Sequence, residues 1–86
     1  KKVFFHARFK KRYKNLRKNE CKRCDQRITL FLSDLQNTVL EDHALAGKLR
    51  GYRSINIGGD LRAQYEIIGT DIVHFVRLGT HSELYE

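Results

Sequence analysis

Several features are scarce or missing in this sequence of 86 residues, and each shortage narrows the class of protein. The apolar runs fall far short of the roughly 20 residues that cross a bilayer, so we expect no membrane-spanning segment and no membrane partner. Two cysteines are too few for a dense disulfide framework, so a reducing, cytoplasmic location is expected. Proline, tryptophan, internal repeats and long linkers are absent, and the chain is short. One domain over residues 1–86 is therefore predicted.

Acidic residues are scarce in the first third of the chain. Residues 1–27 hold twelve basic residues against two acidic ones, a charge of +10, whereas residues 28–86 carry −3. An imbalance of this size indicates a polyanionic partner, either a nucleic acid or an acidic protein. The alternative is a solvated helix face that only keeps the protein soluble. A membrane surface is less favoured as the partner, because the apolar residues of this segment are needed for the core.

The first half of the chain is predicted to form a strand and two helices. Residues 3–5 are a short apolar run typical of a strand. Phe9 and Leu16, seven residues apart, share one face of a first helix whose other face is basic. A second helix is expected to be capped by Asn19 and to carry an apolar stripe as far as about Asn37. Joined by a short link, the two helices form a helical hairpin.

The second half is predicted to form a sheet. Residues 41–50 are interpreted as a polar connection, and Gly58-Gly59 is a strong signal for a hairpin turn. The three predicted strands, the last of them apolar on both faces, cover residues 52–57, 61–68 and 72–78. Residues 82–86 form a last helical turn. The prediction is an α+β fold of order β-α-α-β-β-β, with the helical hairpin packed on a small, mainly antiparallel sheet and a short C-terminal tail.

The two cysteines and two of the four histidines are not assigned to a functional site. Cys21-x-x-Cys24 supplies only two of the four ligands of a structural zinc site, and both sulfurs fall on the apolar stripe of the second helix. We therefore expect both to be core residues. His6 is expected at the surface, and His74 is expected to be a partly buried imidazole with a hydrogen-bond partner.

The other two histidines are placed where side chains can face a cleft. His43 and His81 lie in polar connections next to glycine-bearing turns, and Asp60 directly follows one such turn. Two imidazoles and a carboxylate can bind a metal ion, but the three residues come from well-separated segments, so their spacing gives no support to a metal site. The same groups can transfer protons, because imidazole titrates near about pH 6.5.

Three stretches of the second half resemble the motifs of a known toxin family. They are EDHALAGKLRGYRS at residues 41–54, GDLR at residues 59–62 followed by Tyr65, and FVRLGTHSELY at residues 75–85. Together they are similar to the central and closing motifs of RelE/ParE-superfamily toxins, specifically of the YafQ branch. The preceding basic helical hairpin also fits the family plan, so a RelE-like fold is expected.

The resemblance implies a ribosome-dependent endoribonuclease, or mRNA interferase, which is the toxin of a type II toxin–antitoxin pair and inhibits translation. The implied partners are mRNA, the ribosome with its ribosomal RNA, and a cognate antitoxin protein; no cofactor is implied. The implied reaction is metal-independent attack of a ribose 2′-OH on the adjacent phosphate, which leaves a cyclic phosphate. It needs a base for the 2′-OH proton, an acid for the 5′-oxygen, and positive charge around the phosphate.

The resemblance also carries the family's catalytic positions onto His43, Asp60, His81 and Tyr85. His81 is expected to be the general acid or the general base, with His43 as its partner. Asp60 would orient an imidazole or accept the 2′-OH proton, and Tyr85 would stack on a base or contact the phosphate. The groups expected to bind or orient the substrate, most of them cationic, are Lys48, Arg50, Arg53, Asn56, Arg62 and Arg77.

Two other functions are compatible with the same sequence. The first is a non-nuclease toxin of the same fold that inhibits DNA gyrase, although such a relative is not expected to retain Gly79-Thr80-His81. The second is a non-catalytic RNA-binding domain, which explains the charge but leaves the paired histidines unused. Asn56 and Leu61 stand where the best-known member of the branch has histidine and tryptophan, so Asn56 is interpreted only as a substrate-orienting group.

Overall fold

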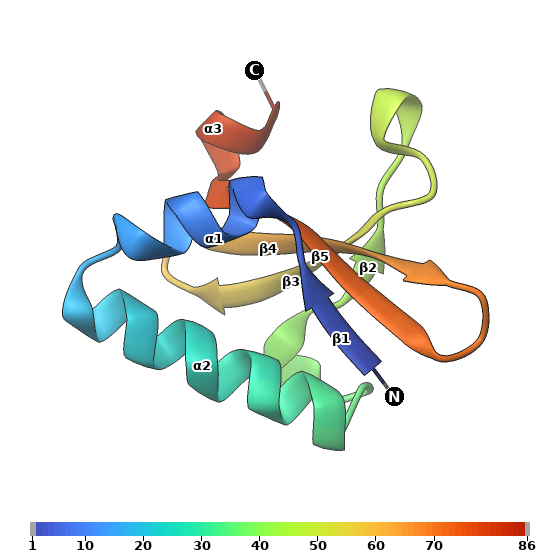
Figure 1. The fold of residues 1–86 in the computed structure, drawn as a ribbon, viewed down its shortest axis with the longest axis horizontal. Helices are drawn as coiled ribbons and strands as arrows, with labels where there is room; N and C mark the ends of the chain where they lie inside the picture. The colour runs from blue at the N-terminus through green and yellow to red at the C-terminus, as the bar shows by residue number, and fades with distance from the viewer. Residues whose placement is uncertain (1, 86) are drawn as a thin grey trace.

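A five-stranded sheet with two helices on one face forms the body of the molecule (Figure 1). The computed structural model describes residues 2–85. The elements, of which η1 and η2 are 3₁₀ turns, are β1 (Lys2–Phe5), α1 (Ala7–Lys14), α2 (Lys18–Ser33), η1 (Thr38–Leu40), β2 (His43–Ala44), η2 (Gly47–Leu49), β3 (Arg53–Gly58), β4 (Leu61–Ile68), β5 (Ile72–Thr80) and α3 (His81–Tyr85). The predicted α+β class is confirmed, and the predicted elements occur in the predicted order, with β2 and the two 3₁₀ turns in addition.

The sheet is mainly antiparallel, as expected. Its strand order is β1-β5-β4-β3-β2, and among the strands of residues 2–85 only the β1–β5 pair is parallel. The hairpin between β3 and β4 turns at Gly58 and Gly59, whose φ angles of 127° and 56° favour glycine. The last strand, predicted over residues 72–78, lies inside the sheet between β1 and β4 and extends to Thr80.

Residues 41–50, predicted as a plain connection, contain two short elements. β2 pairs with β3 through His43 and Ser54, and η2 follows three residues later. The prediction missed β2 because two residues are too few to show an alternating pattern. The loop of residues 45–52, which we call the η2 loop, rises from the sheet on the side opposite α2 (Figure 1).

The bounds of two helices also differ from the prediction. α2 begins at Lys18 rather than after a cap at Asn19, because the backbone N–H of Arg17 donates to Glu20 Oε1 at 2.9 Å. It ends at Ser33 rather than near Asn37, and Asn37 instead caps η1 by accepting from Val39 N at 3.0 Å. α3 covers most of the predicted last turn, and Glu86 lies outside the described residues.

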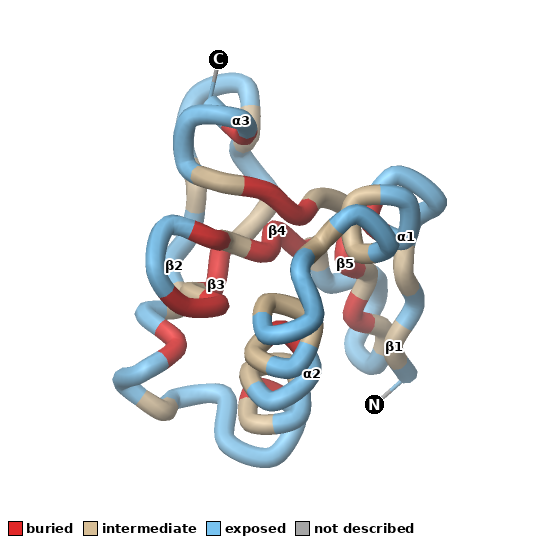
Figure 2. The backbone as a smooth tube through the Cα atoms, turned by 90° about the vertical axis from the view of Figure 1, so that its left-hand side faces the viewer, coloured by how far each residue is buried: buried red, intermediate tan, exposed pale blue. Residues whose placement is uncertain are grey.

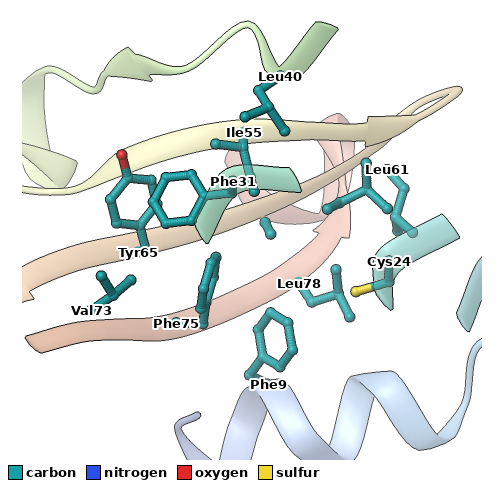
Figure 3. Close-up of a cluster of buried hydrophobic side chains, with 12 residues drawn as sticks. Phe9, Cys24, Phe31, Leu40, Ile55, Leu61, Tyr65, Val73, Phe75 and Leu78 are labelled. Carbon is teal, nitrogen blue, oxygen red and sulfur yellow. The ribbon is translucent and has the colours of Figure 1, made fainter. Parts of the chain in front are cut away.

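The core lies between the sheet and the α1–α2 hairpin, and buried segments follow the inner strands and one side of α2 (Figure 2). The ring of Phe31 lies 5.7 Å from that of Phe75 and 4.7 Å from that of Tyr65 (Figure 3). Cys24 is fully buried in the same core cluster, near Leu61 and Leu78 (Figure 3), as predicted, and burial raises the pKa of its thiol to about 12. The prediction that Cys21 is also a core residue is wrong, because its side chain is only half-buried. Within the described residues, no helix has the length and apolar character to cross a membrane.

Candidate functional site

The face of the sheet turned away from α2 carries most of the predicted site residues. Ile55 and Ile57 of β3 are fully buried toward the helices, so the alternating residues between and beside them point to the other side. In Figure 1, α3 and the η2 loop both rise from that side. We call this surface the open face; its strand residues include Ser54, Asn56, Arg62, Gln64 and Arg77.

One row of the open face crosses four strands. His43 pairs with Ser54, Ser54 pairs with Gln64, and Gln64 pairs with Arg77. Residues paired in register point to the same face, and neighbouring strands are about 4.8 Å apart, so the row is roughly 14 Å long. His43 and Arg77, which are far apart in sequence, therefore lie at the two ends of one continuous row.

The next row brings Asn56 and Arg62 together. Arg62 Nη1 donates to Asn56 Oδ1 and to the carbonyl oxygen of Gly59, each at 3.0 Å. Asn56 Oδ1 also accepts from the backbone N–H of Gly58 at 3.0 Å. These contacts fix the Arg62 guanidinium over the β3–β4 turn. None of them is to a carboxylate, so they leave its positive charge uncompensated.

Asp60, His81 and Tyr85 form a second group at the end of the same turn. The backbone N–H of His81 donates to the carbonyl oxygen of Asp60 at 3.2 Å, so the start of α3 is attached to the β3–β4 turn. The rings of His81 and Tyr85 lie 4.6 Å apart and both side chains are exposed. An imidazole, a phenol and a carboxylate-bearing residue thus meet at one edge of the open face.

Glu83 fixes the start of α3 and with it His81. Its Oε1 accepts from the backbone N–H of Thr80 at 2.8 Å, and Thr80 Oγ1 accepts from the N–H of Glu83 at 3.3 Å, which is a capping box. Arg12 of α1 also donates to Glu83 Oε1 at 3.0 Å. The Thr80 N–H and the Arg12 guanidinium lower the pKa of Glu83.

His43 is exposed on the edge strand β2, and its tautomer can be inferred from one contact. Its Nδ1 lies 2.8 Å from the carbonyl oxygen of Glu41, and a carbonyl can only accept. Nδ1 therefore carries the proton in the neutral ring, which leaves a lone pair on Nε2. Such an imidazole is able to act as a base through Nε2.

Arg53 is the one predicted phosphate-binding cation that the structure places away from the open face. It pairs in register with Tyr65, a buried residue of the core side, and its Nε donates to Asp42 Oδ1 at 3.0 Å. Tyr65 donates to the other carboxylate oxygen at 2.7 Å, and burial together with Asp42 raises the pKa of Tyr65. The charge of Arg53 is thus compensated within the fold. Arg50 is exposed at the end of η2.

A cavity of about 340 Å³ adjoins the open face, and we call it the side cavity. Two of the predicted substrate-binding cations, Lys48 and Arg77, line it. Residues that the sequence analysis did not assign to a site line it as well, among them His6, Arg8, Gln64 and His74. His6 is exposed and His74 is partly buried against Glu66, as predicted. Their proximity was missed, because it depends on the parallel pairing of β1 with β5.

The carboxylate and the two imidazoles considered as metal ligands do not form a metal site. Within residues 2–85, no group of three or more histidine, cysteine, aspartate or glutamate side chains is arranged to hold a metal ion. The residues that do converge include cations, imidazoles and amides beside the carboxylate-bearing Asp60 and Glu66, and the cations among them are suited to binding a phosphate.

Comparison with known proteins identifies the family. The profile described as "Bacterial toxin of type II toxin-antitoxin system, YafQ" matches residues 1–86. The chain belongs to the YafQ toxin family. No curated protein matches it at a significant level.

Solved structures of the same superfamily share the fold of this YafQ-family chain. YafQ from E. coli strain BL21(DE3) is 22% identical, with a TM-score of 0.84 over 100% of this chain and 99% of that one. A copper-bound mutant toxin from Helicobacter pylori is 26% identical, with a TM-score of 0.70 over 98% of both chains. The RelB–RelE antitoxin–toxin complex from Methanococcus jannaschii contains a chain 23% identical, with a TM-score of 0.75 over 96% of this chain and 95% of that one.

Proposed function

We propose that this YafQ-family toxin is a ribosome-dependent endoribonuclease that cleaves mRNA in the cytoplasm and so inhibits translation. The observation that carries the proposal is the attachment of His81 to the Asp60 turn, with Tyr85 beside it, at the edge of a face that presents cations. Acid–base groups next to cations are what strand scission by a neighbouring 2′-OH requires.

The proposed reaction moves one proton at each end of the phosphate. The base takes the 2′-OH proton as the O2′–P bond forms, and the acid gives a proton to the 5′-oxygen as the P–O5′ bond breaks. The Nε2 lone pair of His43 makes that imidazole a candidate for the base, and His81 is the candidate for the acid; the two belong to the separate groups described above, and no hydrogen bond or ring contact joins them among the described residues. Asp60 would orient the His81 ring, and Tyr85 would stack on a base next to the scissile phosphate.

The cations of the open face would bind the phosphate and balance its negative charge. Arg62 is preorganised by Asn56, and Lys48 and Arg77 lie together at the side cavity. Arg50 is exposed on the η2 loop and able to reach the RNA backbone. Arg53 is not included in this proposal, because it lies on the other face and is paired there with Asp42.

The test is a translation-coupled cleavage assay with mapping of mRNA ends. Wild-type protein should cut within codons, and His81→Ala or His43→Ala should each reduce cutting by roughly 100-fold or more, the usual contribution of a general acid or base. Ser82→Ala, at an exposed neighbour of His81, is the matched control and should cut normally. Unchanged cutting by both histidine variants would overturn the mechanism, and inhibition of gyrase supercoiling with intact mRNA would overturn the function.

We also propose two macromolecular partners for the basic surface of α1 and α2. Exposed lysines there, among them Lys10, Lys11, Lys14, Lys18 and Lys22, would bind ribosomal RNA through its phosphates. A cognate antitoxin with an acidic segment would cover the same surface or the open face, as the RelB–RelE complex shows an antitoxin bound to a protein of this fold. Co-purification with the product of the adjacent reading frame, and rescue of growth by it, tests this partner; neither binding nor rescue would count against it.

A further inference from the structure

Arg27 of α2 reaches the backbone of the strand that carries Asn56. Its Nη1 donates to the carbonyl oxygen of Val39 in η1 and to that of Asn56 in β3, each at 3.2 Å. The short strand β2 pairs with β3 only at Arg53 and Ser54, so the outer edge of β3 has no strand beside it from that point on. Arg27 thus supplies a donor to an edge carbonyl group that no neighbouring strand can reach.

The strand is irregular at the same point. The register between β3 and β4 shifts between Asn56 and Gly58, so Ile57 is an extra residue on β3. A β-bulge of this kind interrupts the ladder of hydrogen bonds and increases the local twist. Strand pairing alone therefore restrains the backbone of Asn56 less than that of a regular strand residue, and the contact with Arg27 adds a restraint there.

Asn56 connects Arg27 to Arg62. Its carbonyl oxygen accepts from Arg27 of α2, and its side-chain Oδ1 accepts from Arg62 Nη1 at 3.0 Å on the open face. The direction of a side chain follows from its backbone, so a shift of the Asn56 backbone would move the oxygen that holds the Arg62 guanidinium. The two arginines, which lie on different elements, are therefore linked through one residue.

The positive charges around the β3–β4 turn are not balanced within the fold. Within residues 2–85, neither Arg27 nor Arg62 forms an ion pair, not even with Asp60 of the same turn. Arg23, one helical turn before Arg27, lies against this turn: its Cδ is 3.1 Å from the position of a Cβ added at Gly58, and its buried Nε has no hydrogen-bond partner in that part of the chain. Three such cations are suited to an anion that comes from outside the protein, such as an RNA phosphate.

We propose that Arg27 is a positioning residue that holds Arg62 in place for an mRNA phosphate, acting through Asn56. The inference deepens the proposed function and rests on it for the identity of the phosphate. Arg27 itself binds the backbone of β3 and is not assigned a contact with RNA. Without Arg27, the Asn56 backbone would be less restrained and the Arg62 guanidinium would sample other orientations, whereas the proposed acid and base would keep their own contacts.

NMR of the Arg62 side chain tests the positioning step without requiring cleavage. Arg27→Leu should shift and broaden the guanidinium signals of Arg62, because their hydrogen-bonded geometry is lost. Lys22→Leu, which removes one charge from an exposed position of the same helix, is the matched control and should leave them unchanged. Arg27→Gln, too short to bridge the two carbonyl oxygens, replaces Arg27→Leu if that variant does not fold. Unchanged Arg62 signals in a folded Arg27 variant would overturn the proposal.

A double-mutant cycle in the translation-coupled cleavage assay separates positioning from a general loss of structure. Arg27→Leu should lower kcat/KM by roughly 10-fold, the size of one weakened hydrogen bond to a charged group, and should leave the pH profile of the rate unchanged. In the Arg62→Ala background the same substitution should have no further effect, because Arg27 acts through Arg62. Effects that multiply in the double variant, or an altered pH profile, would overturn the assigned role. Absence of cleavage by the wild-type protein would overturn the endoribonuclease and leave the NMR result for Arg62 standing.

Discussion

Arg12 of the basic helix α1 and Glu83 of α3 form an ion pair at 3.0 Å, although 71 residues separate them in the sequence. The same Glu83 oxygen accepts the backbone N–H of Thr80, the residue before His81. The position of the proposed catalytic imidazole is therefore linked to the helix proposed to bind ribosomal RNA.

Glu83→Ala should impair cleavage more than folding. The substitution removes both the cap of α3 and the contact to Arg12, which should cost about 1 kcal/mol of stability. Displacement of His81 by a fraction of an ångström should lower the cleavage rate by roughly 10- to 100-fold. Glu83→Gln keeps the acceptor for the Thr80 N–H and should restore most of the rate. Cleavage assays alongside thermal melts check this, and equal rates for Ala and wild type would contradict it.

Lowering the pH should detach α3 from the sheet before the whole protein unfolds. The pKa of Glu83 is lowered in the folded protein by Thr80 and Arg12, so its stabilising contribution is complete above the ordinary carboxyl pKa of 4.5. That contribution is lost as the pH falls through the lower pKa of the folded state. NMR signals of residues 80–85 should shift below about pH 4.5. The same titration of Glu83→Gln should show no such transition.

The two cysteines should differ in reactivity. Burial raises the pKa of the Cys24 thiol to about 12, so its thiolate is nearly absent at neutral pH, whereas Cys21 is half-buried. In the native state a thiol reagent should label Cys21 first and Cys24 only after unfolding. Mass spectrometry of Cys21→Ser and Cys24→Ser under native and denaturing conditions distinguishes the two sites. Rapid native labelling of Cys24 would be inconsistent with its place in the core.

Asp42 should be important for stability through Tyr65 and Arg53. Asp42→Ala leaves the buried Tyr65 hydroxyl without its 2.7 Å acceptor and the Arg53 guanidinium without its carboxylate, and should cost about 1–3 kcal/mol. Tyr65→Phe in the same background should recover part of the loss, because the unpaired hydroxyl is then gone. A double-mutant cycle by urea denaturation measures this coupling. Strictly additive losses would show that the contact does not contribute as inferred.

Phe75 should be among the most costly core residues to truncate. Its ring lies within 5.6–5.7 Å of the rings of Phe5, Phe9, Phe31 and Tyr65, so it joins β1, α1, α2 and β4. Phe75→Ala should destabilise the protein by about 3–5 kcal/mol. Phe4→Ala, at a side chain 53% exposed, is the matched control and should cost far less. Similar losses of stability for the two variants would contradict the assigned core.

Most of the fold could be predicted because its signals are local. The alternation over residues 61–68 and the Gly58-Gly59 turn predicted the central hairpin, and the stripe through Cys24 and Phe31 predicted the buried side of α2. β2 was missed because a strand of two residues has no pattern of its own and forms only against β3. The predicted start of α2 was wrong because Asn19 is not the cap of the helix. Arg17 is the cap, and its backbone N–H donates to the side chain of Glu20, three residues later.

The site was less predictable because it depends on pairing between distant strands. The motif residues Asp60, His81 and Tyr85 do lie together, but Arg53 faces Asp42 on the other side of the sheet. A strand residue changes face with every position, so an arginine in a motif can be directed to either side. The side cavity had no local signal at all.

The sequence by itself determined the segregation of positive charge, the order of the elements, the apolar faces and the family motifs, because each is carried by neighbouring residues. Only the tertiary structure decided which side chains share a row or a cavity. Parallel pairing of β1 with β5 placed His6 beside His74, and the register of β4 placed Gln64 between Ser54 and Arg77. Such registers are set by long-range packing of the whole sheet, for which no short stretch of the chain carries the information.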